Sequence, residues 1–562
     1  MYDTDLVKEI EDEVIKEFQI IKRTPFIEKT IGLLEIVRAI DDIFYFYSYA
    51  LPGDDPNNEY WYKYFKQHHN GFYECLEQIS YEEDKIENSN LFYNSNPGSK
   101  HWANHTLLHC GNLGYTSRFL QLVKQGIFSL EKKESNRLLF KCRIRQSGAE
   151  WLETQLQKGL LGKKVLVGLK IPRIKELEAA IEQEFAQKVF LWNTHFIQYD
   201  TSPIIDEFFD LQAEAFSKGF VGHDSFTGDS KFNGINYNVI QKVLKWLVAS
   251  SSKHVSFCAH ALNKYGNTKI NQWNFLTTPY NIVQLVQTIN RDTGIPVDRV
   301  KWIVGILTLR KDNLHIHLGA PGSSLPLLIQ IEKNWVLRSV AGCLANPFTY
   351  LIRCLKFYCK DDYSKNVNLR EDYFKEEFYS IFNNGSIITC GKQVELRKDK
   401  KILTDIDAML FDTNNRTLLI VQLKWMDDFG TSMAQRYSMA KNMYESSVKW
   451  IDKTDQWLRE NDPTNLLHHF NIDHKDKKVE KVEKLILGRF FAHFSDKQID
   501  KRALWCGWPQ FVHLTRQKKV RSSIDALIKE IQKEAISKVI LKTKVPEENF
   551  KLGKYLVTVI VK

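Results

Sequence analysis

Apolar residues recur at three- and four-residue spacing through most of the first half of the chain, a pattern typical of amphipathic helices. The helices we expect from this spacing cover residues 6–21, 27–50, 107–126, 174–192 and 240–248. Two stretches rich in proline, glycine and asparagine, "LPGDDPNNE" and "NSNPGSKH", predict loops between them. The pattern therefore predicts a mostly helical amino-terminal region.

Short apolar runs of strand length appear later in the chain. The segment 306–319 predicts a hairpin with Asp312 and Asn313 in the turn, and 403–425 predicts a second hairpin around "DTNNR". The remaining expected elements are helices over 371–382, 433–450 and 522–536 and strands within 482–494, 503–514 and 554–562. Helices and strands therefore both contribute to this part of the chain.

The 562 residues are enough for several domains, and the overall class we predict is a multidomain α/β protein. The polar stretch "GLLGKK" at 159–164 and the charged stretch 360–372 mark the expected boundaries. We therefore predict a helical domain over 1–165, a mainly helical middle domain with a short hairpin over 166–360, and a sheet domain over 361–562.

Two polar residues interrupt the second strand of the later hairpin. "LLIVQLKW" is apolar on both faces, as in a central strand covered on both sides, yet it carries Gln422 and Lys424 two residues apart on one face. Buried polar groups need polar partners, and Asp405 and Asp407 share one face of the preceding strand. An edge hairpin with a solvated polar face is the alternative interpretation.

This group of side chains suits one kind of chemistry. Two carboxylates and an amide oxygen are ligands for a hard divalent cation such as Mg²⁺, which leaves room for water and phosphate. A lysine beside the cation can orient or deprotonate a water molecule or neutralise charge on a phosphate. The pattern therefore indicates phosphodiester hydrolysis.

These residues also carry a resemblance to a known family. "DIDAMLF", a turn and "LLIVQLKW" resemble the core of the PD-(D/E)XK nuclease superfamily, also called restriction endonuclease-like. Asp407 matches the aspartate of the motif, and Gln422, Leu423 and Lys424 match the (D/E)XK positions in a QXK form similar to that of Mrr-like restriction endonucleases. The resemblance implies a mixed β-sheet flanked by helices.

The family carries a glutamate on a helix that precedes the motif hairpin. In the expected helix 371–382, Phe374, Phe378 and Ile381 form an apolar stripe, and Glu377 follows Phe374 by three positions. Glu377 is therefore our match for the helix glutamate, with a surface glutamate at the margin of the stripe as the alternative.

The resemblance implies a role for each matched residue. Asp407 would be the principal ligand of Mg²⁺ or Mn²⁺, with the Gln422 side-chain oxygen and the Leu423 backbone carbonyl beside it. Lys424 would position or activate water, and Glu377 would orient water or hold a second ion. Gln422 stands where the motif usually has an acid, so the site carries one negative charge less. A nucleic-acid-binding or scaffold protein that keeps the fold without cutting is the alternative function.

The charge distribution adds a partner to this picture. Of the net charge of +10, the 36 basic and 29 acidic residues of 361–562 contribute +7. The local cluster of Arg516, Lys518, Lys519 and Arg521 predicts contacts with phosphates, against a solvated helix face as the alternative. We expect nucleic acid as the partner, DNA rather than RNA by the resemblance, in a setting of bacterial defence against foreign DNA. The amino-terminal region would recognise a substrate, bind a partner protein or form a homo-oligomer.

Other features bear on location. The acidic, amphipathic residues 1–20 do not have the pattern of a targeting sequence, and no run of 18 uncharged apolar residues predicts a membrane span. The nine cysteines show no CxxC spacing, which fits thiols in a reducing cytoplasm.

Histidines form two further patterns. His101, His105 and His109 lie on one face of a predicted helix, where they could bind a transition metal or simply form a polar helix face. His315 and His317 would share a strand face but have no third ligand, so we expect them to be structural.

Overall fold

The computed structural model describes residues 3–23, 29–50, 57–79, 91–134, 136–143, 148–266, 270–318, 324–382, 386–427, 433–470, 478–494, 497–536 and 547–560. Its helices are α1 (Thr4–Arg23), α2 (Lys29–Tyr45), the π-helix η1 (Phe46–Ala50), α3 (Asn58–Gln78), α4 (Pro97–Lys124), α5 (Gly148–Leu169), α6 (Pro172–Lys188), α7 (Pro203–Ser217), α8 (Tyr237–Tyr265), η4 (Gln272–Asn274), α9 (Ile282–Thr293), α10 (Val297–Leu307), η5 (Leu314–Ile316), α11 (Val340–Leu344), α12 (Pro347–Tyr358), α13 (Lys360–Asn368), α14 (Arg370–Ser380), α15 (Met433–Glu460), η6 (Pro463–Phe470), α16 (Trp508–Thr515), α17 (Lys518–Arg521) and α18 (Ile524–Ile536).

The strands are short and belong to several small sheets. They are β1 (Phe128–Lys133), β2 (Arg137–Cys142), β3 (Val189–Trp192), β4 (Phe196–Tyr199), β5 (Lys231–Phe232), β6 (Ile235–Asn236), β7 (Thr278–Asn281), β8 (Thr308–Leu309), β9 (Leu328–Glu332), β10 (Trp335–Arg338), β11 (Ile387–Thr389), β12 (Val394–Lys398), β13 (Lys401–Ile406), β14 (Ala408–Asp412), β15 (Thr417–Lys424), β16 (Lys481–Gly488), β17 (Leu504–Gly507), β18 (Glu547–Leu552) and β19 (Tyr555–Ile560).

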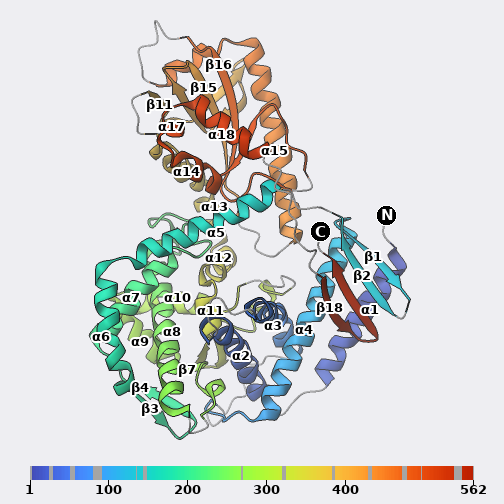
Figure 1. The fold of residues 1–562 in the computed structure, drawn as a ribbon, viewed down its shortest axis with the longest axis vertical. Coiled ribbons are helices and arrows are strands. Elements are labelled where there is room, and N and C mark those ends of the chain that lie inside the picture. The colour runs from blue at the N-terminus through green and yellow to red at the C-terminus, as the bar shows by residue number, and fades with distance from the viewer. Residues whose placement is uncertain are drawn as a thin grey trace.

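The protein is a mixed α/β molecule whose amino-terminal half is mostly helical, as the spacing of apolar residues predicts. Figure 1 shows a sheet-containing unit above a larger, mainly helical body. The unit is formed by residues 370–536 and is called the sheet unit below. The long helix α15 descends from it toward the larger body, and α5 lies where the two meet (Figure 1).

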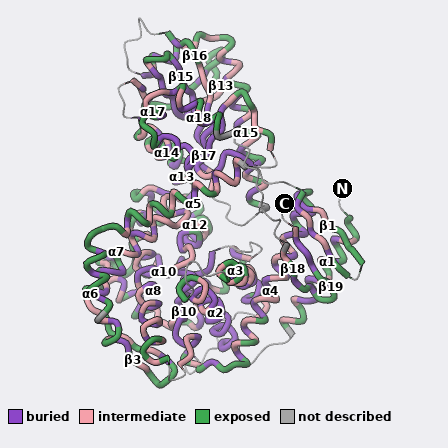
Figure 2. Tube along the Cα trace, viewed as in Figure 1, coloured by how far each residue is buried: buried purple, intermediate pink, exposed green. Residues whose placement is uncertain are grey.

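The sheet unit is built on a five-stranded sheet in the order β11-β14-β15-β16-β17. β14 is antiparallel to both β11 and β15, whereas β15, β16 and β17 run parallel to one another. The sheet is therefore mixed, and β15 lies in its centre with seven of its eight residues buried (Figure 2). This confirms the prediction of a central strand and excludes the edge hairpin.

Alternate side chains of β15 enter two different cores. Leu419, Val421 and Leu423 pack in the core that contains residues of α14, α16 and α18. Leu418 and Ile420 pack in the opposite core, which contains residues of α15 and η6. Since residues two apart share a face, Gln422 and Lys424 continue the α15 side of the strand.

One expected hairpin is wrong. Residues 306–319 form the end of α10, the two-residue strand β8, which pairs in parallel with β9, and the 3₁₀ turn η5. The Asn313 side chain explains the difference, because it donates to the Thr308 carbonyl at 2.9 Å and accepts from the Arg310 backbone N–H at 2.7 Å. The loop thus closes on itself instead of forming a ladder, so His315 and His317 do not share a strand face.

Residues 159–164, where we expected a domain boundary, lie inside α5. Gly159 and Gly162 face open space, with no atom near the position that a Cβ would occupy. Glycine weakens a helix interior by only about 1 kcal/mol. The tertiary contacts of α5 at Glu150, Glu153 and Lys164 hold the helix across them.

The last two strands leave the sheet unit. β19 pairs in parallel with β2, and the resulting four-stranded sheet has the order β1-β2-β19-β18. Figure 1 shows β18, in red, beside the cyan strands β1 and β2 and near the blue helix α1. The apolar alternation of "YLVTVIVK" correctly predicts a strand but does not reveal which sheet receives it. The range 361–562 is therefore not one compact unit.

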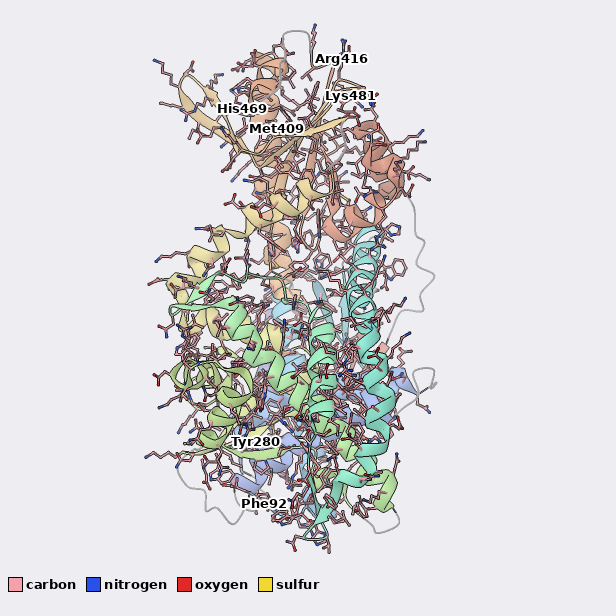
Figure 3. The ribbon with its side chains drawn as sticks, turned by 90° about the vertical axis from the view of Figure 1, so that its left-hand side faces the viewer. Phe92, Tyr280, Met409, Arg416, His469 and Lys481 are labelled. Carbon is pink, nitrogen blue, oxygen red and sulfur yellow. The ribbon has the colours of Figure 1, made fainter. Side chains whose placement is uncertain are left out.

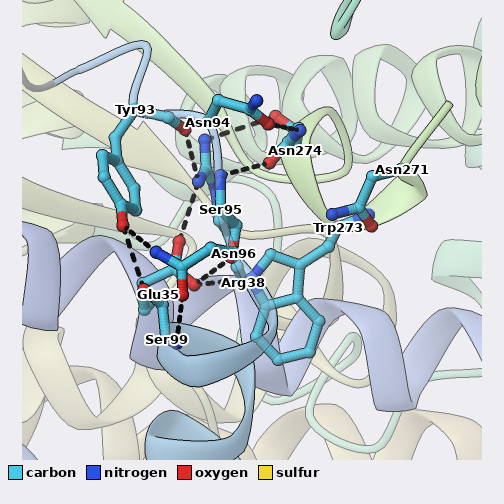
Figure 4. Close-up of polar contacts among 10 residues, drawn as sticks. All are labelled: Glu35, Arg38, Tyr93, Asn94, Ser95, Asn96, Ser99, Asn271, Trp273 and Asn274. Carbon is cyan, nitrogen blue, oxygen red and sulfur yellow. Dashed lines mark hydrogen bonds and ion pairs between the residues drawn. The ribbon is translucent and has the colours of Figure 1, made fainter.

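A buried ion pair organises part of the larger body. Arg38 donates to Glu35 and to the Tyr93 carbonyl, both at 2.8 Å, and Glu35 also accepts from Ser95 at 2.5 Å and from the Trp273 indole at 3.0 Å (Figure 4). Glu35 and Arg38 are both almost fully buried. The network joins α2, the segment before α4 and η4, which lie far apart in the sequence.

Two predictions about composition can be compared with the structure. In the described ranges, no helix is long and apolar enough to cross a membrane. All nine cysteines are buried and carry thiols rather than disulfides.

The position of β19 generates a test. Val557 is fully buried in a core with Leu138 and Phe140, whereas its neighbour Leu556 is 37% exposed. We expect Val557→Asp to raise hydrogen exchange in β2, because a buried carboxylate without a partner is costly. Leu556→Asp, the matched control, should change stability by no more than about 0.5 kcal/mol. Exchange in β15 should stay the same in both variants, and a selective rise there would contradict this strand order.

Candidate active site

Asp407, the predicted principal metal ligand, lies where the chain passes from one sheet to another. β13 pairs with β12 in a separate two-stranded sheet, while β14 belongs to the five-stranded sheet. Asp407 is the single residue between β13 and β14, and it is buried. The expected strand 403–411 is thus two strands, and Asp407 occupies the junction between them.

The Asp407 carboxylate replaces a missing strand partner. The β14–β15 ladder ends at the pair Ala408 and Val421, so the backbone of Leu423 has no β14 residue opposite it. Oδ2 of Asp407 accepts the Leu423 backbone N–H at 2.7 Å and also a hydrogen bond from Nε2 of Gln422. This satisfies a buried backbone donor in the centre of the sheet.

The same geometry directs a second backbone group into the site. The N–H and C=O of one strand residue point to the same side of the strand. Because the Leu423 N–H points to Asp407, its carbonyl oxygen is directed to that side as well. The structure therefore brings together Asp407, the Gln422 amide and the Leu423 carbonyl, as the sequence predicts.

The electrostatics of this group show an excess of negative charge. Burial raises the pKa of Asp407 to about 7, and the nearby charges of Glu371 and Asp405 act in the same direction. The Leu423 N–H and the Lys424 ammonium oppose this shift. Burial also raises the pKa of Glu371, with Lys424 opposing and Asp405 adding to the shift.

These properties fit a divalent cation with oxygen ligands. Asp407, the Gln422 oxygen, the Leu423 carbonyl and Glu371 supply hard oxygen donors. A cation would favour the ionised form of Asp407, against the burial and the nearby negative charges that raise its pKa. Among the described residues, no three histidine, cysteine, aspartate or glutamate side chains are arranged to hold a metal ion. The donors that Asp407, Gln422, Leu423 and Glu371 could offer a metal are all oxygen atoms, the ligand type of Mg²⁺ or Mn²⁺.

The predicted helix glutamate lies elsewhere. Glu377 forms an ion pair with Arg489, and its Oε1 accepts from the Tyr373 hydroxyl at 3.5 Å. The glutamate of α14 whose charge acts on Asp407 is Glu371, six residues earlier. Glu371 therefore replaces Glu377 as our candidate for the helix glutamate.

A signal for Glu371 is present in the sequence. Glu371 precedes Phe374 by three residues and Phe378 by seven, and both phenylalanines are fully buried. This spacing puts Glu371 on the same face of the helix as the two phenylalanines, at the exposed amino-terminal end of that face.

Arg436, near the start of α15, forms a buried ion pair with the larger body. Arg436 donates two hydrogen bonds to the carboxylate of Glu150 on α5, both at 2.6 Å, and both side chains are buried. This pair connects the sheet unit with the larger body.

The basic cluster lies at the other end of the sheet. Arg516, Lys518, Lys519 and Arg521 are exposed, while the Val520 between them is buried as an anchor. The residues that follow the cluster contact the β14–β15 turn, where the Ile524 N–H and the Asn415 side chain form hydrogen bonds with Asp412 and Ser523. Figure 3 shows Arg416 and Lys481, at the same end of the sheet, at the tip of the sheet unit.

This arrangement sets a distance for any shared substrate. Asp407 and Asp412 lie at opposite ends of the five residues of β14, which span about 17 Å at the usual rise per strand residue. A nucleic acid that contacts both the cluster and Asp407 must therefore extend along the whole strand.

The three predicted histidines of α4 form a stripe but no metal site. The rings of His101, His105 and His109 are about 6 Å apart in sequence order, at 6.1 and 6.0 Å. His109 is paired with Glu17 of α1 at 3.1 Å. The polar-face alternative therefore describes this helix better than a zinc site.

Comparison of the chain with protein-family models, curated proteins and solved structures finds no match.

The raised pKa of Asp407 generates a test of the site. Asp407 ionises near pH 7 in the folded protein and near pH 3.8 when unfolded, so the folded state binds more protons between these values and stability falls as the pH rises. Relative to wild type, Asp407→Asn should therefore gain up to about 4 kcal/mol of stability between pH 4 and pH 8. Thermal or urea unfolding of both proteins across this range measures the difference.

Magnesium supplies the control for this measurement. At pH 8, Mg²⁺ should stabilise the wild type, since a ligand that binds only the folded state adds to its stability, and it should not stabilise Asp407→Asn. A stability difference between the two proteins that is constant with pH would argue against a buried, charge-strained Asp407.

Proposed function

We propose that the protein is a metal-dependent endonuclease that hydrolyses phosphodiester bonds of nucleic acid, with DNA favoured over RNA. The observation that carries the proposal is the meeting of Asp407, Gln422 and Lys424 at the junction of β13, β14 and β15, with the charge of Glu371 acting on them. A mixed sheet with helices on both faces, the architecture that the PD-(D/E)XK resemblance implies, supports it further.

The metal would be held by oxygen atoms of this group. Asp407 and Glu371 offer carboxylates, Gln422 its amide oxygen, and Leu423 its backbone carbonyl. When bound, Mg²⁺ or Mn²⁺ would polarise the scissile phosphate and neutralise charge that develops in the transition state.

The chain's own residues would complete the reaction. Water attacks phosphorus and forms a new P–O bond, the P–O bond to the leaving sugar oxygen breaks, and that oxygen takes up a proton. Lys424 lies on the same strand face as Gln422 and is close enough to act on Asp407 and Glu371. It would position the attacking water and stabilise the charged phosphate.

The rest of the molecule suggests how substrate is chosen. The basic excess of the carboxy-terminal region favours an anionic partner. The large helical body would recognise a substrate or a partner protein, and the likeness to Mrr-like restriction endonucleases suggests defence against foreign DNA in a bacterium. The competing function is a nucleic-acid-binding protein that keeps this fold without cutting.

Cleavage assays with purified protein test the proposal directly. Supercoiled plasmid, single-stranded DNA and RNA should be incubated with Mg²⁺, Mn²⁺ or EDTA, and products separated on gels. We expect cleavage of DNA with either metal and none with EDTA. Binding of equal strength in Mg²⁺ and EDTA, with no product from any substrate, would favour the non-catalytic function.

Variants at the site refine the test. Lys424→Ala should lower kcat by about 10²- to 10³-fold, the usual cost of removing one group that stabilises charge in the transition state. Glu371→Gln should weaken the response to metal, whereas Glu376→Gln, an exposed neighbour on the same helix, should behave as wild type. Full activity in Lys424→Ala would remove this residue from the mechanism.

The basic cluster predicts a salt dependence of binding. Replacing Lys518, Lys519 and Arg521 together by alanine should reduce the slope of log affinity against log salt by about 0.9 for each lost phosphate contact. The control variant, with arginine at Lys518 and Lys519, keeps the charge and should keep the slope. Fluorescence anisotropy with duplex DNA measures both, and an unchanged slope in the alanine variant would place the DNA elsewhere.

A further inference from the structure

A buried arginine lies next to the end of the candidate active-site strand. Arg489 follows β16 directly, and its backbone N–H donates to the Lys424 carbonyl at 2.8 Å. Its side chain is only 4% exposed. Any displacement of Arg489 therefore acts on the backbone of Lys424.

The guanidinium of Arg489 is bound from two directions. Nη1 is paired with Glu377 on α14, and Nη2 donates to Asp224 at 2.8 Å. Its guanidinium also lies 4.4 Å from the centre of the Trp425 ring, the residue that follows Lys424. Asp224 belongs to the larger body, in the segment between α7 and β5.

Asp224 is held in its charged form. Burial alone would raise its pKa, but Arg489 and Lys164 lower the pKa of Asp224 to about 2. Lys164 comes from α5 and lies 3.4 Å from the Asp224 carboxylate. The larger body thus supplies a fixed negative charge to the side of the sheet unit that carries Lys424.

A second arginine holds the same stretch of chain. Arg370 is paired with Asp427 at 2.6 Å and donates to the Ser225 carbonyl at 2.8 Å. Its guanidinium also lies 4.3 Å from the centre of the Phe226 ring. Residues 425–427 therefore lie between Arg370 and Arg489, and both arginines contact residues 224–226 of the larger body.

We propose that Arg489 and Asp224 are positioning residues for Lys424, so that the active site is fully assembled only when residues 224–226 of the larger body are docked against the sheet unit. This inference rests on the proposed nuclease function. It makes the larger body part of the catalytic apparatus rather than a separate recognition module. It also gives Glu377 a role, as the second anion that holds Arg489.

A pocket beside Arg489, Asp224 and Glu377 leaves room for the Arg489 side chain to move. This pocket of about 210 Å³ lies between α5 and α16, and Asp224, Glu377 and Arg489 line one part of it. Leu161, Lys164, Phe490, Trp508 and Val512 line the rest. Without Asp224, Arg489 would keep a single anion and could turn into this pocket toward water. The backbone bond to Lys424 would then move with it, and a displacement of about 1 Å in an active site can cost about 10²-fold in rate.

The test compares two buried ion pairs that both join the larger body to the sheet unit. Asp224→Asn removes the anion next to Arg489, and Glu150→Gln removes the anion of the Arg436 pair, which joins α5 to α15. We expect Asp224→Asn to lower kcat by about 10²-fold with KM unchanged, because Lys424 acts on the transition state. Glu150→Gln should lower thermal stability and leave kcat as in wild type.

A second measurement does not depend on cleavage. Trace labelling with an amine-reactive reagent, followed by peptide mass spectrometry, gives the reaction rate of Lys424 in each folded protein. We expect this rate to rise in Asp224→Asn and in Glu377→Gln, and to match wild type in Glu150→Gln.

The two readouts separate the two hypotheses. A wild type that cuts no substrate would overturn the nuclease function, while a selective rise in Lys424 labelling would still support the positioning role. Unchanged labelling of Lys424 in both Asp224→Asn and Glu377→Gln would overturn the positioning role, as would equal losses of kcat in Asp224→Asn and Glu150→Gln. If Asp224→Asn does not fold, Glu377→Gln decides the question, since it removes the other anion of Arg489.

Discussion

The hydrogen bond between the Asp407 carboxylate and the Leu423 N–H is the interaction on which the candidate site depends. A strand that is buried on both faces has no access to water, so each of its backbone donors needs a partner within the protein. β14 begins too late to supply one, and Asp407 takes its place. With Asp407 in that place, a carboxylate is fixed beside Gln422. The end of β15 that extends beyond β14 stays open to other oxygen atoms, and the buried negative charge favours a cation.

A second level of organisation comes from buried charges that cross between the sheet unit and the larger body. Arg436 meets Glu150, Arg489 meets Asp224, and His493 meets Glu153, which raises the pKa of His493 against the effect of burial. Breaking such a pair leaves an uncompensated charge in a dry environment, so a shifted docking arrangement is penalised even where its apolar contacts would be adequate. The pairs therefore favour a single relative placement of the two parts.

Local pattern was enough to predict the hairpin of Asp407 and Lys424, the central position of β15 and the helix before it, because burial on two faces leaves a continuous apolar run in the sequence. The sequence pattern did not predict the features that depend on long-range contacts. The glycines of α5 look like a linker until the anchors at Glu150 and Glu153 are known, and nothing local in β19 indicates pairing with β2. The stripe of helix 371–382 predicts Glu377 as the site glutamate, but Glu377 pairs with Arg489, a buried arginine that follows β16 and lies far away in the sequence.

The return of β18 and β19 to the sheet of β1 and β2 has a consequence for the order of assembly on the ribosome. The sheet unit is contiguous in sequence and can collapse as soon as residues 370–536 have emerged. The amino-terminal sheet, although its first strands are made early, stays incomplete until residues 547–560 are synthesised, so β2 waits with an unpaired edge. During this interval the nascent chain exposes a strand edge that attracts other strands, and a chaperone that covers it would protect the protein from aggregation at that stage.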